Sequence, residues 1–259
     1  MRWLTGILCA VLLSGCQTMA PETAEPPVVD PYQLHMRAGG FELALMTPPR
    51  PSGPVSRLYI EADFKVGPQG MLMAQKGLGY LLFSNDPGSY YVRFPCFEQS
   101  PSGCDSRYLT SHRYATEQSE AVARILEEFK RIHDVKRLEV VAIGDAAPLM
   151  LKVAALGGEI DHLHTIDGML SPAIWARQKG MTPPASSDPL IYFRQLSRQA
   201  QTHWISSGSG PLQEHMAGRY KAVLKQSGCV RLRIASTVKR DADWLKVWPR
   251  LRNDRFRCS

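Results

Sequence analysis

"RLEVVAIGDAAPLMLKVAALG", residues 137–157, decides the fold class of this chain. The first eight residues are mainly aliphatic and β-branched, which predicts a buried strand that ends at Gly144. Residues 147–157 then predict an apolar helix that ends at the pair Gly157-Gly158. A buried strand that turns directly into a helix is typical of a parallel sheet.

The same alternation extends outward in both directions. The pattern predicts strands at 41–46, 57–62, 89–94, 162–168, 202–208 and 229–236, and helices at 71–83, 116–133, 211–228 and 241–252. The helix at 116–133 is strongly amphipathic. Strands separated by helices indicate an α/β fold, with a mainly parallel sheet and helices on both faces.

The N-terminus predicts a lipid anchor. Arg2 precedes an apolar stretch that is too short to span a membrane, and residues 13–16, "LSGC", resemble the bacterial lipobox. We therefore expect residues 1–15 to be a signal peptide and Cys16 to be acylated, which would hold the protein on a membrane. Gln17 after the cysteine favours the outer membrane, with the domain facing the periplasm or the cell surface. Residues 16–31 are Pro-rich and predict a tether, and 32–259 predict one domain.

The net positive charge is moderate and carries no pattern typical of nucleic-acid binding. The formal net charge of +7 falls to about +6 when Arg2 leaves with the signal peptide. Apart from residues 248–258, the basic residues are scattered, and no zinc-finger or helix-turn-helix pattern accompanies them. We expect no nucleic-acid partner. A solvated basic surface is the expectation for these charges, and anionic lipid head groups or acidic partners are the alternative.

The cysteines predict disulfides. Once Cys9 and Cys16 are set aside, Cys96, Cys104, Cys229 and Cys258 remain, an even number for an oxidising compartment. Three pairings are possible. Cys96 and Cys104 would close a short loop, so we predict Cys96–Cys104 and Cys229–Cys258.

The sequence predicts neither a metal nor a cofactor. His162 and His164 share one face of their strand, which is the only spacing typical of metal ligands. The chain has no C-x-x-C pair and places no third ligand beside these histidines. A structural or solvated role is the expectation for both.

Four further stretches carry a resemblance to a known fold: "RLYIEAD" (57–63), "VRFPC" (92–96), "VVAIGDAAPLMLKVAAL" (140–156) and "HTIDGMLSPAIW" (164–175). Over residues 40–255 the chain resembles the α/β-hydrolase fold, and within it a group of bacterial lipoproteins and secreted proteins. The resemblance implies a serine nucleophile in a G-x-S-x-G turn, a following acid and a histidine base.

None of these groups stands where the resemblance implies it. Residues 144–148 read Gly-Asp-Ala-Ala-Pro, which puts Ala146 at the nucleophile position. The acid position falls at Gly210, and the base position, four residues before Trp244, is Arg240, which stays charged. The oxyanion loop has Ala62 and Phe64 around Asp63 in place of glycines.

We therefore predict a catalytically degenerate domain that has a binding or assembly role and does not act as a hydrolytic enzyme. The alternative is an active serine-type or aspartate-type ester hydrolase with a relocated catalytic set. Asp145 and His203, with serines at 206, 207 and 209, would supply that set. A third reading is a small-molecule or lipid carrier, which requires an apolar pocket near Ala146.

Overall fold

The computed structural model describes residues 34–48, 53–62, 64–66, 72–74, 77–96, 105–186, 188–224, 227–254, 256 and 258. Pro31–Ser259 forms one compact unit. The predicted signal peptide, Cys16 and the tether at 16–31 lie outside the described residues and stay predictions. No helix within the described ranges is both long and apolar enough to cross a membrane.

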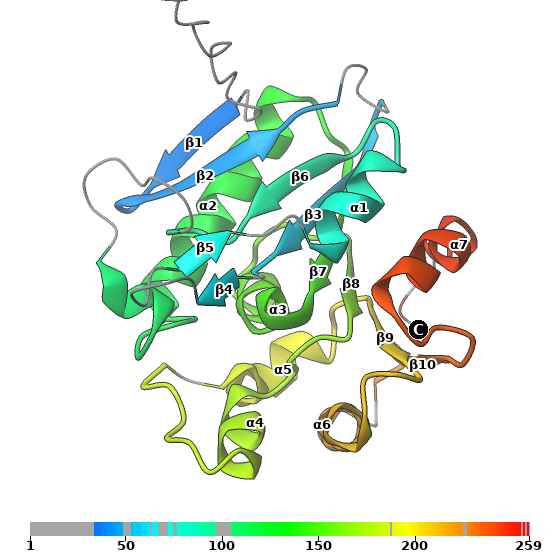
Figure 1. The fold of residues 1–259 in the computed structure, drawn as a ribbon. Coiled ribbons are helices and arrows are strands. Elements are labelled where there is room, and N and C mark those ends of the chain that lie inside the picture. The colour runs from blue at the N-terminus through cyan, green and yellow to red at the C-terminus, as the bar shows by residue number, and fades with distance from the viewer. Residues whose placement is uncertain are drawn as a thin grey trace, which may run out of the picture. The chain divides into compact units, whose positions relative to one another are not determined.

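An eight-stranded sheet forms the centre of the domain (Figure 1). In spatial order its strands are β1 (Leu34–Ala38), β2 (Phe41–Met46), β6 (Tyr90–Arg93), β3 (Val55–Glu61), β7 (Arg137–Ile143), β8 (His162–Ile166), β9 (Gln201–Ser206) and β10 (Val230–Ala235). The pairs β1–β2 and β2–β6 are antiparallel and all others are parallel. The predicted mainly parallel sheet is confirmed.

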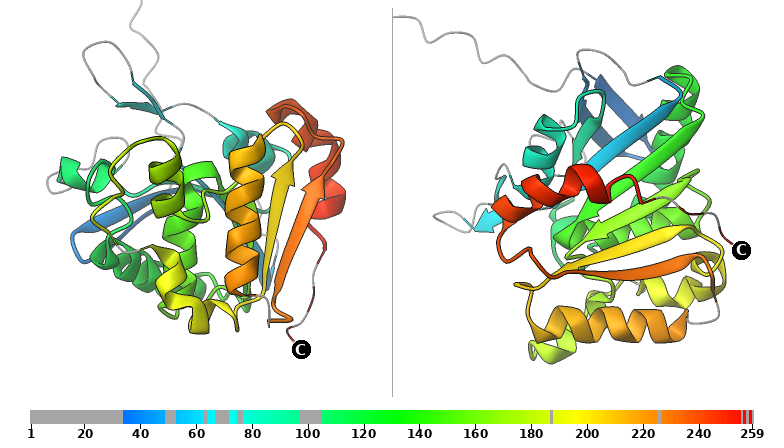
Figure 2. Two further views of the ribbon diagram at one scale, coloured as in Figure 1. Left: turned by 90° about the horizontal axis from the view of Figure 1, so that it is seen from below. Right: turned by 90° about the vertical axis from the view of Figure 1, so that its right-hand side faces the viewer.

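Helices cover both faces of the sheet, as Figure 2 shows. Alternate strand residues belong to two separate cores: Val140 and Ala142 pack with one set of helices, whereas Val141 and Ile143 pack with the other. The first core includes α2 (Thr116–Ile132), α3 (Ala147–Ala155) and α6 (Pro211–Val223), and the second includes α1 (Leu78–Ser84) and α7 (Asp241–Leu251). This double burial explains why β7 has a continuous apolar sequence rather than an alternating one.

The segment between β8 and β9 is a long connection that carries helices of its own. It contains α4 (Pro172–Gln178), a 3₁₀ turn at Pro189–Tyr192 and α5 (Phe193–Leu196). Its last turns lead into β9, and its first half lies beyond the carboxyl end of β8. The sequence analysis predicted no helix here.

The helix predicted at 71–83 is wrong in its first half. Leu72–Ala74 is strand β5, which pairs with β4 (Phe64–Val66), and α1 begins only at Leu78. Glu61 determines this start: its buried carboxylate accepts hydrogen bonds from the amides of Gly77 (3.1 Å) and Gly79 (2.6 Å). A Cβ at Gly79 would lie 2.8 Å from Glu61 Oε2, so a glycine permits this contact.

The C-terminal tail is fastened to the edge strand β10. Cys229 and Cys258 form the predicted disulfide, with their Cα atoms 4.5 Å apart. Asp254 pairs with Arg231 at 3.3 Å, and the Arg231 guanidinium lies 3.9 Å from the centroid of the Phe256 ring. The other predicted pair, Cys96–Cys104, involves Cys104, which lies outside the described residues.

Candidate functional site

The carboxyl ends of six parallel strands, β6, β3 and β7 to β10, meet at one edge of the sheet. Ligands of open α/β sheets bind at this edge. A sharp bend there follows β7: Gly144 has φ +52° and starts a 3₁₀ turn at Gly144–Ala146, after which α3 begins. A side chain at such a position would be strained, which is the backbone feature that a nucleophile turn requires.

The bend lies at Gly144 rather than at Ala146, where the sequence analysis expected the nucleophile position. The sequence analysis placed Ala146 at its tip, but Ala146 is fully buried in the core beneath it. Gly144, two residues earlier, takes the positive φ and remains half-exposed. Ala142 and Ala146 then occupy the flanking positions that must be small. The bend lies at Gly144 because β7 ends at Ile143, so the chain turns directly after the strand.

The expected acid position also lacks a carboxylate. Gly210, which precedes α6, has no side chain to offer. Another carboxylate, that of Asp167, lies at the end of β8. Its Oδ1 accepts the Ser206 amide at 2.7 Å. Burial raises the pKa of Asp167, and the hydrogen bond from the Ser206 amide opposes that rise. Asp167 therefore joins the ends of β8 and β9.

The expected base position is a cation on the surface. Arg240 is exposed and caps the N-terminus of α7, and its amide donates to Asp243 Oδ2 at 3.1 Å. Residues 236–240, between β10 and α7, contain no histidine. In the predicted oxyanion loop, Ala62 is buried, Asp63 lies outside the described residues and Phe64 is the first residue of β4.

His203, the imidazole of the alternative catalytic set, is part of the core. It is 2% exposed, its Nδ1 lies 2.8 Å from Thr165 Oγ1 and its Nε2 lies 3.0 Å from Gln201 Oε1. Burial lowers the pKa of His203 to about 3, with a smaller contribution from His162. Both ring nitrogens are occupied by neighbouring side chains, so His203 is not placed to take a proton from a serine at the sheet edge.

The two other strand histidines form no metal site. The rings of His162 and His164 are stacked with their centroids 4.3 Å apart, and Trp204 Nε1 donates to His164 Nδ1 at 3.3 Å. Among the residues that the structure describes, no group of three or more His, Cys, Asp or Glu side chains could hold a metal ion.

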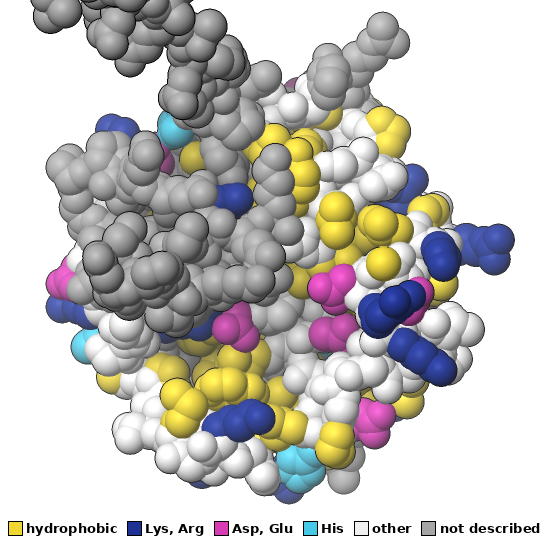
Figure 3. Space-filling view, viewed as in Figure 1, with side chains coloured by type: hydrophobic (Ala, Val, Ile, Leu, Met, Phe, Trp, Pro, Cys, Tyr) yellow, Lys and Arg dark blue, Asp and Glu magenta, His cyan; other side chains and the backbone are white. Residues whose placement is uncertain are grey.

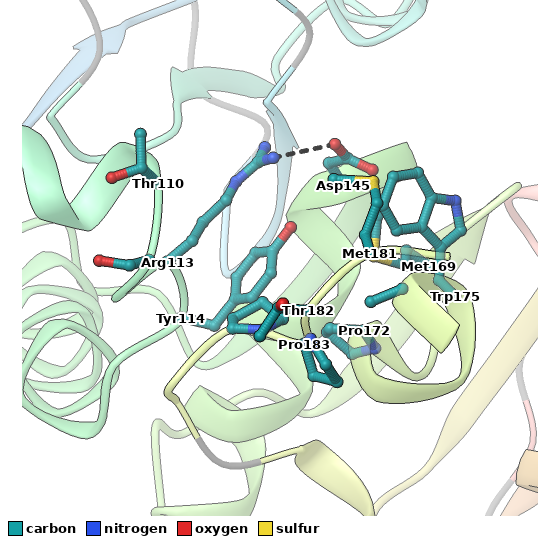
Figure 4. A pocket seen from close by; sticks show the side chains of 13 residues that line it. Thr110, Arg113, Tyr114, Asp145, Met169, Pro172, Trp175, Met181, Thr182 and Pro183 are labelled. Carbon is teal, nitrogen blue, oxygen red and sulfur yellow. Dashed lines mark hydrogen bonds and ion pairs between the residues drawn. The ribbon is translucent and has the colours of Figure 1, made fainter. Parts of the chain in front are cut away.

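A cavity of about 540 Å³ opens beside the bend at Gly144 (Figure 4). Its walls are largely apolar and come from the segment after β8, including Met169, Pro172, Trp175, Met181 and Pro183. Figure 3 shows hydrophobic side chains gathered over α4 on this face. The volume lies within the range of about 300–1,000 Å³ that small-molecule sites occupy.

One end of the cavity is polar. Asp145, which follows the bend, accepts a hydrogen bond from Arg113 Nη1 at 3.1 Å. The hydroxyl of Tyr114 points toward this ion pair, as Figure 4 shows. Among the described residues that line the cavity, Asp145 and Arg113 are the charged ones. The sequence analysis considered Asp145 but missed Arg113 and Tyr114, because the segment before α2 carries no motif.

A serine–imidazole pair lies at the rim of the cavity and was also missed. Ser111 lines the cavity, and its Oγ lies 3.0 Å from Nδ1 of His112. The two residues are sequence neighbours in a turn. The amides of Thr110 and His112 both donate to the Arg107 carbonyl, and the Arg113 amide donates to that of Thr110. These three amides are therefore engaged within the turn and are not available to stabilise an oxyanion.

Comparison with known proteins supports the fold. No protein-family model matches the chain, and neither does any curated protein sequence. Among solved structures, the acylaminoacyl peptidase of Pyrococcus horikoshii is similar with a TM-score of 0.54 and 16% identity, over 81% of this chain and 38% of that protein. The chain thus spans well under half of that peptidase.

Two other proteins match over most of both chains. An α/β serine hydrolase without a lid from Xanthomonas campestris has a TM-score of 0.51 and 14% identity, covering 86% of this chain and 94% of its own. Est1E from Butyrivibrio proteoclasticus has a TM-score of 0.54 and 11% identity, covering 83% and 93%. The fold is that of the α/β-hydrolases. At these identities the likeness concerns the fold alone.

Proposed function

We propose that this protein is a membrane-anchored lipoprotein of the cell envelope whose α/β-hydrolase domain binds a ligand or partner without hydrolysing it. The observation that carries the proposal is Gly144: the residue at the sharp bend has no side chain with which to attack a substrate. A glycine also relieves the strain that the bend would impose on any other residue.

The other catalytic positions support the same conclusion. Gly210 offers no acid, Arg240 cannot act as a base, and Asp167 is bonded to a backbone amide. A serine triad needs the nucleophile, base and acid in one hydrogen-bonded chain, and loss of any member removes most of its activity. The cavity beside the bend is nevertheless open and lined for binding.

The anchor is proposed from the sequence. Cys16 follows a lipobox-like stretch, and two or three acyl chains at about 0.8 kcal/mol per buried CH₂ would hold the protein stably on a membrane. Gln17 favours the outer membrane, and a protein of the envelope is the expected partner. Exposed basic side chains on α7, at Lys246 and Arg250, suit contact with an anionic surface. The C16S variant should leave the membrane fraction.

Activity measurements on the full-length protein test the absence of catalysis. The protein, in detergent, should show no turnover of p-nitrophenyl acetate or butyrate above a denatured control, and no covalent labelling by a fluorophosphonate probe. Labelling or turnover that a single substitution at the cavity or at the sheet edge abolishes would overturn the proposal.

A second candidate function, a hydrolase with a relocated catalytic set, is favoured by the Ser111–His112 pair. Ser111 lines the cavity, and its hydroxyl lies 3.0 Å from an imidazole nitrogen of His112, which is the distance that base-assisted attack requires. This candidate predicts labelling that S111A and H112A each abolish. The engaged amides of the turn and the absence of a carboxylate bonded to His112 among the described contacts make it the weaker candidate.

A further inference from the structure

We propose that the cavity beside Gly144 selects an uncharged amphiphile: a molecule with an apolar chain and a head group that both donates and accepts a hydrogen bond, such as an alcohol or a primary amide. This inference rests on the proposed function, because it names the ligand class of the same non-catalytic site. Three features of the cavity carry it: its apolar wall, its neutralised ion pair and its unpartnered hydroxyl.

The apolar wall of the cavity favours a ligand with a hydrocarbon chain. Met169, Trp175 and Met181 line the cavity together with prolines, and about 540 Å³ is enough for a chain of eight or more carbons. Burial of each CH₂ of the ligand against this wall favours binding. Methionine side chains are flexible, so the wall can adapt to the shape of the chain.

The ion pair fixes the charge of the head group. Arg113 and Asp145 are 3.1 Å apart and are the only charges on the described lining, so their charges largely cancel. An anionic head would lie beside the Asp145 carboxylate and a cationic head beside the Arg113 guanidinium. In an apolar cavity neither ion would recover the free energy of leaving water. An uncharged polar head avoids both costs.

The hydroxyl of Tyr114 fixes the hydrogen-bonding character of the head group. Tyr114 is 1% exposed, and its hydroxyl has no hydrogen-bond partner in the described part of the chain. Burial raises the pKa of Tyr114, so the hydroxyl keeps its proton at neutral pH and can donate it. The Asp145 carboxylate, 37% exposed, can only accept. A head that accepts from Tyr114 and donates to Asp145 satisfies both.

The chain holds Tyr114 in place for this contact. Tyr114 has φ +67°, which is uncommon for a residue with a side chain. Its carbonyl accepts a hydrogen bond from the buried Lys152 Nζ at 2.5 Å, and its amide donates to Gln118 Oε1 at 3.1 Å. A strained residue fixed from two helices is typical of a pre-organised binding site.

Binding of an eight-carbon series tests the inference. Octan-1-ol, octanamide, octanoate, octylammonium and methyl octanoate are titrated into protein comprising residues 31–259, a form that contains every strand and core residue described. Tryptophan fluorescence provides the signal, because Trp175 lines the cavity and is half-exposed, whereas Trp204, Trp244 and Trp248 are buried. We expect the alcohol and the amide to bind at least about tenfold more tightly than either ion.

The variants locate the contacts. Y114F should weaken binding of the alcohol and of the amide by about fivefold, which corresponds to the loss of one hydrogen bond. The matched control Y90F removes the hydroxyl of another buried tyrosine that does not line the cavity, and should change nothing. W175F should abolish the fluorescence change.

The outcomes separate this inference from the proposed function. Preference for octanoate or octylammonium, equal affinity across the series, or no effect of Y114F would overturn the inference while leaving a non-catalytic domain intact. Hydrolysis of methyl octanoate would overturn the proposed function itself. Alcohol and amide preference that Y114F weakens, without hydrolysis, would support both.

Discussion

Acid sensitivity tests the structural role assigned to His203. The imidazole is held neutral by burial, which lowers its pKa from 6.5 to about 3. The unfolded chain, with an ordinary pKa, binds a proton below pH 6.5, whereas the folded protein does not until about pH 3. The unfolded state therefore binds more protons between these values. Stability is fully kept above pH 6.5 and falls as the pH drops toward 3.

The size of the effect follows from the two pKa values. Linkage gives a loss of about 2 kcal/mol from this one group at pH 5, against about 0.2 kcal/mol at pH 7. The measurement is urea unfolding of residues 31–259 and of its H203Q variant at pH 7, 6 and 5. Glutamine retains a donor and an acceptor for Thr165 and Gln201 but does not titrate.

The comparison uses slopes rather than absolute stabilities. H203Q is expected to lose about 2 kcal/mol less than the parent protein between pH 7 and pH 5, because all other groups titrate in both proteins. Parallel losses in the two proteins would refute a buried neutral His203. That result would return His203 to the set of imidazoles that are available for proton transfer.

Three further variants test the tail, the bend and the cavity. Replacing Cys229 and Cys258 together by alanine should lower the free energy of unfolding by about 3.5 kcal/mol, because the disulfide closes a loop with a sequence separation of 29 residues. Urea unfolding measures this loss, and an unchanged midpoint would contradict it. G144S should lower the free energy of unfolding by about 1–2 kcal/mol, because serine is strained at this positive φ. The new serine should still not be labelled by a fluorophosphonate, because Arg240 stands at the base position, and labelling would show that a base is present. Y114F should raise the ligand-free unfolding free energy by about 1 kcal/mol, since it removes an unpartnered buried hydroxyl, and a lower urea midpoint would show that this hydroxyl has a partner.

The sequence predicted the sheet well where a strand is buried on both faces. The strand at 137–144 and the helix at 147–157 match β7 and α3 to within two residues, because unbroken aliphatic runs and a terminal glycine are strong local signals. The edge strand β1 was missed: its sequence, "LHMRA", mixes polar and apolar residues, and its pairing with β2 is a tertiary contact.

The candidate site was predicted only in part, for a related reason. Ala146 and Gly144 both belong to the correct turn, but which of them carries the positive φ depends on where β7 stops. Arg113 and Tyr114 come from a turn before α2 and reach Asp145 only through folding, over a separation of about 30 residues that no local pattern reveals. Sequence patterns locate elements, whereas contacts between distant turns require the fold.

The carboxylates at the sheet edge have structural roles of their own. Glu61 is bonded to the amides at the start of α1, and Asp167 to the amide of Ser206. Each ends a strand, and each satisfies backbone donors that would otherwise be buried without partners. Their removal would therefore cost stability whether or not the protein has a substrate. The bend at Gly144 carries no such bond through a side chain, so loss of a nucleophile there would leave the packing of β7 and α3 unchanged.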